Sequence, residues 1–339
     1  MTCEYDRVPD TTEQVQGQSP PTPPAPLLLR WSPELLDDAY WGLRAFHHFA
    51  VNTSETLPGS HIPSVKNCWT VQVPILALSH KPLRNEVVAL AALHLSTQGC
   101  QDDELLACRA SSLDAALQTY RPALGEIGPE TADAACFTAI LLLVDAFAVL
   151  QYRELVPYEP PMQWLRLARG ARTVFEASYP LVKASSSSIM TIIASSPDEP
   201  GLDAGANIMQ TFVHLLQPCH GEKKQLQPVA DIYERTALYL SAIQAAVMSH
   251  EGPLALCRRL MSFPCLVPPL FLDLVEQKEP RALAMIGHLF ALSSHIKNLW
   301  WVGSTPSREV HAIRAYLPPE LQHLMALPCR LVDVNSQSK

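Results

Sequence analysis

The 339-residue sequence has few glycines and few charged residues, and no stretch has the pattern of a β-hairpin. Thirteen glycines stand against 30 prolines, and no run alternates apolar and polar residues between Asn-Gly or Asp-Gly turns. Only 17% of the residues are charged whereas 48% are hydrophobic, which is enough to bury a substantial core. The composition therefore predicts a helical protein whose helices begin and end at prolines.

Motifs of the common catalytic centres are also absent. The sequence contains no G-x-G-x-x-G, P-loop, H-E-x-x-H or G-x-S-x-G segment. His288 and His295 share one helix face but lie about 10 Å apart along the axis, which is too far for one metal ion. We expect no catalytic residue, no cofactor and no metal site, although an enzyme with an unfamiliar motif stays open.

The chain has no excess of positive charge and no targeting segment. It carries 25 Lys and Arg against 33 Asp and Glu, a net charge of −8, so we expect no direct binding to nucleic acid. The N-terminus has no basic segment followed by an apolar one, so we expect no secretion. The most apolar run, residues 134–150, is short for a membrane span and has Asp145 at its centre, so we expect a buried helix. The nine cysteines form no C-x-x-C pair and are expected to be reduced.

Residues 280–303 show the clearest helical pattern. Apolar residues recur at spacings of three and four, and Pro280 occupies the first turn, where its missing N–H costs nothing. The paired Trp300 and Trp301 precede Gly303, a plausible helix end. The pattern predicts a buried helix whose aromatic end packs against another part of the protein.

The rest of the chain predicts an all-α fold: a single large domain of roughly a dozen packed helices over residues 32–328. A disordered proline-rich linker at 1–31 precedes it and a polar tail at 329–339 follows it. Further helices are expected over residues 33–51, 82–96, 101–120, 131–152, 189–194, 230–250, 308–317 and 319–326. The first of these is expected to turn inward the side chains of Leu36, Ala39, Tyr40, Leu43, Phe46, His47, Ala50 and Val51.

Three residues within these helices carry separate expectations. His94 is interpreted as a hydrogen-bonded core histidine rather than a catalytic base. Gly170 is expected where another helix approaches closely, since glycine costs a helix about 1 kcal/mol against alanine. His47 and His48 point about 100° apart on a helix and are not expected to share a metal.

Four blocks resemble the fungal-specific transcription factor domain of zinc-cluster regulators, nearest the sterol-uptake-regulator branch. They are His47-His48-Phe49 with Asn52-Thr53, the V-P-I-L-A and small-residue helix at 73–96, the W-x-x-x-x-x-G-A element at 164–171, and the helix at 280–303 with its W-W-x-G turn. Together the blocks cover residues 33–326. In the third block Arg166 and Leu167 stand where the family has a histidine.

The resemblance implies an all-α regulator of transcription that acts in the nucleus. Cys3-Glu4-Tyr5 resembles the exit of the family's six-cysteine DNA-binding module, or is a chance cysteine in a disordered tail. One vestigial cysteine cannot hold a binuclear zinc cluster. We therefore expect a regulator without its own DNA-binding module that acts through a partner, as a homo- or heterodimer.

The ligand implied by the resemblance is a hydrophobic small molecule, a sterol or a pathway metabolite. The residues expected to line its pocket are His288, Phe290, Trp300 and Trp301, with ordinary core packing as the alternative for each. A second hypothesis is a protein of secondary metabolism that has reused the helical pocket to bind or convert a hydrophobic intermediate.

Overall fold

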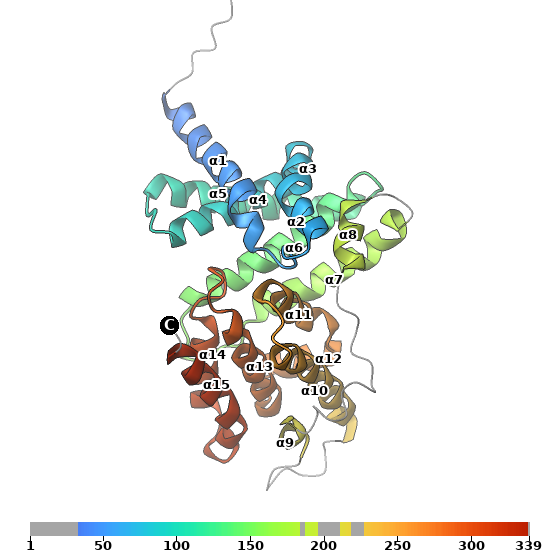
Figure 1. The fold of residues 1–339 in the computed structure, drawn as a ribbon, viewed down its shortest axis with the longest axis vertical. Coiled ribbons are helices and arrows are strands. Elements are labelled where there is room, and N and C mark those ends of the chain that lie inside the picture. The colour runs from blue at the N-terminus through green and yellow to red at the C-terminus, as the bar shows by residue number, and fades with distance from the viewer. Residues whose placement is uncertain (1–32, 184–186, 196–210, 218–226, 338–339) are drawn as a thin grey trace, which may run out of the picture.

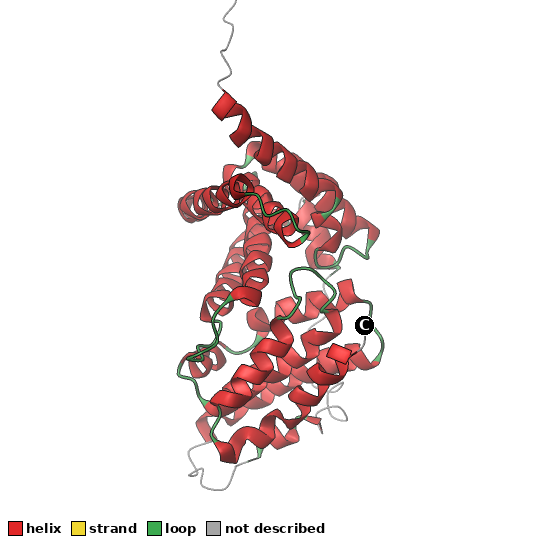
Figure 2. Ribbon diagram, turned by 90° about the vertical axis from the view of Figure 1, so that its left-hand side faces the viewer, coloured by secondary structure: helices red, strands yellow, loops and turns green. Residues whose placement is uncertain are grey.

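The computed structural model describes residues 33–183, 187–195, 211–217 and 227–337. Within these ranges every regular element is a helix and none is a strand (Figure 2), so the predicted all-α fold is confirmed. The linker expected at 1–31, with Cys3, lies outside the described residues.

The first group of helices forms one end of an elongated molecule (Figure 1). Its central helix is α4, against which α1, α3, α5 and α6 all pack. The helices of this group are α1 (Pro33–Val51), α2 (Pro63–Asn67), α3 (Val73–Ser79), α4 (Lys81–Thr97), α5 (Asp103–Ala123) and α6 (Ala132–Ala148). Short turns join them at η1 (Thr53–Thr56), η2 (Cys68–Gln72), η3 (Leu124–Glu126) and η4 (Val149–Tyr152).

The second group forms the opposite end, and α6, the last helix of the first group, lies with α7 between the two ends (Figure 1). After α7 (Met162–Val182) and α8 (Ser188–Ala194), the chain continues with α9 (Val213–Leu216), α10 (Gln227–Met248), α11 (Pro253–Leu266) and α12 (Pro269–Glu276). It closes with α13 (Pro280–Ser293), η6 (Ser294–Ile296), α14 (Thr305–Tyr316), η7 (Pro319–Met325) and α15 (Ala326–Gln337).

Helix α13 is the core of the second group, because α10, α11, α12, α14 and α15 all contact it. Every residue from Arg281 to Ser293 is buried, as expected of a helix that is hydrophobic on all sides. Pro280 occupies its first turn as predicted, and the Glu279 carboxylate accepts a hydrogen bond from the backbone N–H of Ala282 at 2.8 Å. This acid therefore caps the start of the helix.

The helix ends earlier than the sequence pattern suggests. It stops at Ser293, and the paired tryptophans lie in the irregular turn that follows. Gly303 has φ of +45°, a left-handed conformation, and a Cβ there would lie 1.9 Å from Oε1 of Gln151. Gln151 also donates to the carbonyl oxygen of Trp300 at 3.0 Å. The glycine therefore closes the tryptophan turn against η4 rather than ending the helix.

The inward face of α1 differs from the prediction. Trp41, Ala45, His48 and Phe49 are buried, whereas Leu43 is 72% exposed. Tyr40 and Val51 are also exposed, and residues 33–39 are not described at the side-chain level. Two apolar stripes run along this helix, and periodicity could not decide between them. The aromatic stripe is buried because it packs against α4.

Two smaller expectations also need correction. Nothing lies within 4 Å of a Cβ added to Gly170, so no close helix contact explains this glycine. The polar tail expected from residue 329 is helical as far as Gln337, because buried Cys329 and Val332 attach α15 to the core.

Helix α6 continues into η4, and the segment Ala132–Tyr152 is long and apolar enough by composition to cross a membrane. In its most apolar window, however, 83% of the residues are buried inside the protein. The expected charge at its centre, Asp145, accepts two hydrogen bonds from Arg109 at 2.8 and 3.1 Å. This burial and pairing is what the core helix of a globular domain shows.

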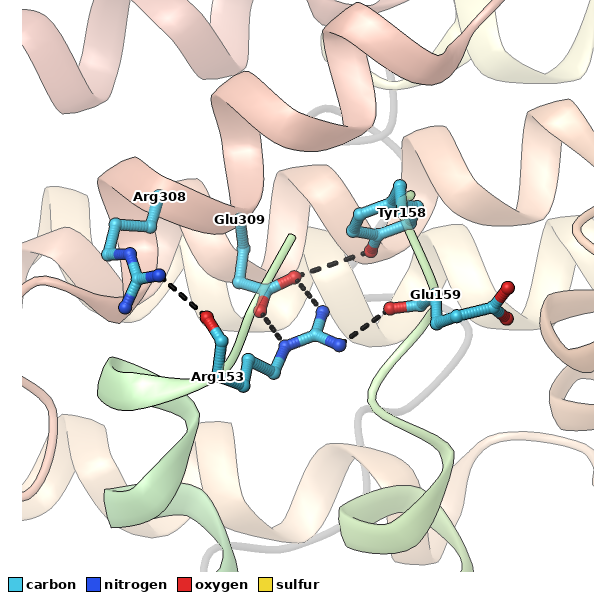
Figure 3. Close-up of polar contacts among 5 residues, drawn as sticks. All are labelled: Arg153, Tyr158, Glu159, Arg308 and Glu309. Atoms are coloured by element: carbon cyan, nitrogen blue, oxygen red, sulfur yellow. Dashed lines mark hydrogen bonds and ion pairs between the residues drawn. The ribbon is translucent and has the colours of Figure 1, made fainter. Parts of the chain in front are cut away.

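A buried ion pair fixes the loop that enters α7 (Figure 3). Arg153 donates from Nε and Nη2 to the Glu309 carboxylate of α14 at 2.6 and 2.7 Å, and Tyr158 donates to the same carboxylate at 3.3 Å. Arg308 donates to the Arg153 carbonyl oxygen and Arg153 to that of Glu159. Burial raises the pKa of Glu309 while Arg153 opposes the rise. The loop, and with it the start of α7, is therefore held against the second group of helices.

Candidate ligand cavity

A half-open cavity of about 420 Å³ lies where α6, α7, α8, α10 and α11 meet. Its volume falls within the usual range for small-molecule pockets, about 300–1,000 Å³. Most of its wall is apolar, and the lining residues are Pro58, Trp69, Ile140, Leu143, Val144, Ala171, Arg172, Phe175, Ile192, Ile193, Tyr239, Ala242, Ile243, Arg258, Arg259, Met261, Ser262, Phe263, Cys265 and Leu266.

The short helix α8 forms one wall and is anchored at both ends by other helices. At its start, the Asp133 carboxylate of α6 accepts hydrogen bonds from the Ser187 hydroxyl and, at 2.9 Å, from the Ser188 backbone N–H. At its end, Arg258 of α11 donates to the carbonyl oxygens of Ile192 and Ser195 at 2.8 and 2.7 Å. These contacts satisfy backbone groups that a helix leaves unpaired at its ends, and they hold the apolar side of α8 against the cavity.

The charged groups of the wall are three arginines. Arg258 is only 6% exposed, and burial lowers the pKa of its guanidinium. Arg172 donates to Glu176 at 2.7 Å and to the Cys265 carbonyl oxygen at 2.9 Å. Among the described residues no Asp or Glu lines the cavity, and the partners described above for Arg258 are backbone carbonyl oxygens.

The remaining polar side chains of the cavity do not form a catalytic set. Burial raises the pKa of the Cys265 thiol to about 12, so this cysteine is protonated and a poor nucleophile. No histidine lines the cavity, and the described part of the chain has no group of three His, Cys, Asp or Glu side chains that could hold a metal.

The four predicted lining residues lie in two other places in the core, and none lines this cavity. His288 is 1% exposed, contacts the Leu324 carbonyl oxygen at 3.1 Å through Nε2, and lies against the Phe212 ring. Burial lowers its pKa to about 3, so it is neutral. Phe290 joins Trp301 through Phe147, whose ring is 6.3 Å from the first and 5.8 Å from the second. Ligand contact by these residues stays a prediction.

The tryptophan turn meets the first group of helices through η1. Trp301 donates to the Thr56 carbonyl oxygen at 3.1 Å and Trp300 to the Thr56 hydroxyl at 3.0 Å. Trp300 also stacks on His94, with ring centres 4.4 Å apart and planes 9° apart. The turn therefore joins the two ends of the molecule.

His94 is the hydrogen-bonded core histidine that the sequence predicts. Its Nδ1 lies 2.9 Å from the Thr53 hydroxyl and 3.3 Å from Nε2 of His48, and its Nε2 lies 3.1 Å from the Gln98 amide. Burial lowers its pKa to about 4. His47, predicted to face inward, is exposed, whereas His48 is buried.

Sequence reasoning missed the cavity because its walls come from helices far apart in the chain. A local signal existed only in α11, where Arg258 and Arg259 interrupt an otherwise apolar helix. A pair of charges inside such a run indicates either an exposed edge or a polar group required in the interior. Periodicity alone could not show that the pair meets α7 and α8.

Comparison with known proteins places the chain among fungal regulators. It is 38% identical over 296 residues to the Zn(2)-C6 fungal-type transcription factor afumD of Aspergillus fumigatus, covering 84% of this chain and 75% of that protein. A Zn(2)-C6 fungal-type transcription factor of Gibberella zeae is 27% identical over 292 residues, covering 82% of this chain but only 58% of the relative. Sterol uptake control protein 2 of Candida albicans is 28% identical over 145 residues, which are 42% of this chain and 20% of that protein. No family model matches the chain.

Proposed function

Because the chain belongs to the family of fungal Zn(2)-C6 transcription factors, we propose that it is a transcription regulator whose helical domain binds a hydrophobic small molecule in the cavity between α6, α7, α8, α10 and α11. The observation that carries this proposal is the apolar cavity of about 420 Å³ in the middle of the fold. Sterol uptake control proteins among the relatives support a hydrophobic ligand of roughly sterol-like size.

The position of the cavity supports a regulatory rather than a structural role. Its walls include α7, whose entry loop is fixed to α14 by the Arg153–Glu309 pair, and α11, which belongs to the second group of helices. A ligand that contacts both groups favours the arrangement in which it binds best, and can shift the population of that arrangement. A partner protein that recognises this arrangement would then receive the signal.

We also propose that contact with DNA requires another module or a partner, and that the protein acts in the nucleus as part of a homo- or heterodimer. The cysteines of the sequence are too dispersed to form a binuclear zinc cluster, since each zinc needs about four ligands. The acidic net charge of −8 likewise supports DNA contact through another module.

The test is a cavity-filling substitution with a control on the same helix. The chain is fused to an unrelated DNA-binding domain and drives a reporter in a fungal host with controlled sterol supply, and the purified protein is melted with and without ergosterol or hexadecan-1-ol. We expect Ala242→Phe, in the cavity wall, to abolish both the reporter's response to sterol supply and the ligand-induced rise in melting temperature.

Ala245→Phe is the control, because Ala245 lies on the same helix α10 but does not line the cavity. It should leave the reporter response and the melting shift unchanged. A response that survives Ala242→Phe in a folded protein would refute binding in this cavity.

A further inference from the structure

The charged side chains that line the cavity are all arginines, although two of them form ion pairs with Glu176 and Glu251 beside it. Arg172 of α7 and Arg258 and Arg259 of α11 line it, and no carboxylate of the described residues does. The rest of the wall is mostly aliphatic and aromatic. A neutral sterol-like molecule would need the apolar wall but would gain nothing from three guanidinium groups in one small cavity.

The arginines differ in the hydrogen bonds that they already make within the protein. Arg258 is used by the fold, because it donates to two carbonyl oxygens at the end of α8. Arg259 donates from Nε and Nη2 to the Glu251 carboxylate, at 2.9 and 2.7 Å. None of the described hydrogen bonds uses Nη1 of Arg259, so this residue of the cavity wall keeps two N–H donors for a ligand.

The surroundings would strengthen a bond to an anion. The Arg259 side chain is 28% exposed, so it is partly shielded from water. Buried Arg258 adds positive charge from the neighbouring position of the same helix. In such partly desolvated surroundings, charge-assisted hydrogen bonds between guanidinium and carboxylate are stronger than bonds between neutral groups.

We propose that the ligand of this cavity is a hydrophobic acid: an apolar body that fills the space between α6, α8 and α10, with a carboxylate bound by Arg259 and Arg172 of the wall. The inference rests on the proposed function, since it assumes that the cavity binds a ligand, and it adds the chemical class of that ligand.

The experiment compares an acid with the alcohol of the same chain length. Binding of hexadecanoate and of hexadecan-1-ol to the purified full chain is measured by calorimetric titration, below the concentration at which either aggregates. We expect hexadecanoate to bind about tenfold more tightly than the alcohol at low salt. This preference should shrink as ionic strength rises, because the cation is partly exposed.

Two variants separate the ligand contact from the ion pair. Arg259→Gln removes the cation and should weaken hexadecanoate binding far more than alcohol binding, so that most of the preference for the acid is lost. Glu251→Gln breaks the same ion pair but keeps the cation, and should preserve or increase the preference. Circular dichroism and alcohol binding verify that both variants are folded.

The outcomes distinguish the two proposals. Equal affinities for acid and alcohol, or a preference that survives Arg259→Gln combined with Arg172→Gln, would overturn the acid inference while leaving a hydrophobic-ligand cavity intact. If neither probe nor ergosterol binds, the ligand-binding part of the proposed function fails together with the inference.

Discussion

The residue with the largest expected effect on stability is Glu309, which is only 1% exposed in its ion pair with Arg153. Glu309→Gln leaves the positive charge of Arg153 without a compensating carboxylate. It should therefore lower the free energy of unfolding by about 3 kcal/mol. Denaturant unfolding of the purified protein measures this loss. The control is Glu176→Gln, which breaks the pair with Arg172 at the surface, where the side chains are 48% and 61% exposed. It should cost less than about 1 kcal/mol, and equal losses would contradict the buried-pair interpretation.

Single residues also show where sequence reasoning is strongest. His94 is a core histidine as predicted, since a histidine within a helix of small apolar residues can only face the core or its edge. The partners of His94 come from η1 and the tryptophan turn. No local pattern joins these positions, which lie far apart in the chain.

At the scale of elements, substitution by alanine of two glycines inside helices is expected to change the stability of the protein in opposite directions. Gly170 of α7 has open space around it, so Gly170→Ala should stabilise the protein by about 0.5–1 kcal/mol through higher helix propensity. A Cβ on Gly287 of α13 would lie 2.4 Å from Cε of Met325, which is itself fully buried. Gly287→Ala should therefore destabilise the protein by about 1 kcal/mol, because the cost of overpacking exceeds the gain in helix propensity.

Thermal and denaturant unfolding of both variants measures the contrast. Met325→Ala in the background of Gly287→Ala tests its cause, since removal of the opposing methyl group should cancel part of the clash. A stabilising effect of Gly287→Ala would show that the Met325 side chain moves at little cost.

Elements were predicted well where one pattern dominated. Helix α13 begins at Pro280 as expected, and α8 and α10 lie close to their predicted ranges. Prediction failed for α1, where two apolar stripes compete along one helix and the one with Trp41, Ala45 and Phe49 is buried. It also failed for the end of α13 and for the helical conformation of α15, because both depend on packing against other helices.

At the scale of the whole molecule, buried neutral histidines should make the protein sensitive to acid. The pKa of His288 falls from 6.5 to about 3 on folding because of burial. Below pH 6.5 the unfolded chain therefore binds a proton that the folded chain refuses, so stability falls as pH decreases from 6.5 toward 3. Glutamine can keep the contact to the Leu324 carbonyl oxygen but does not titrate, so His288→Gln should flatten the stability curve in this range.

Unfolding free energies between pH 4 and 7 measure this dependence. His311→Gln is the control, because the His311 side chain is 47% exposed and faces Asp333 at the surface. Its curve should follow that of the unmodified protein. A steep curve that persists in His288→Gln would assign the acid sensitivity to other groups.

The sequence by itself determined the fold class, the positions of most helices and the family. These predictions rest on local properties: the spacing of apolar residues, prolines at helix starts and the tryptophan turn. Such properties can be recognised in the sequence because residues on one face of a helix share the same environment. Tertiary structure alone decided the cavity, because its wall combines residues from Pro58 to Leu266 whose helices meet only after folding. The same holds for the charge of that cavity: Arg172, Arg258 and Arg259 become one cationic wall through the packing of α7 against α11.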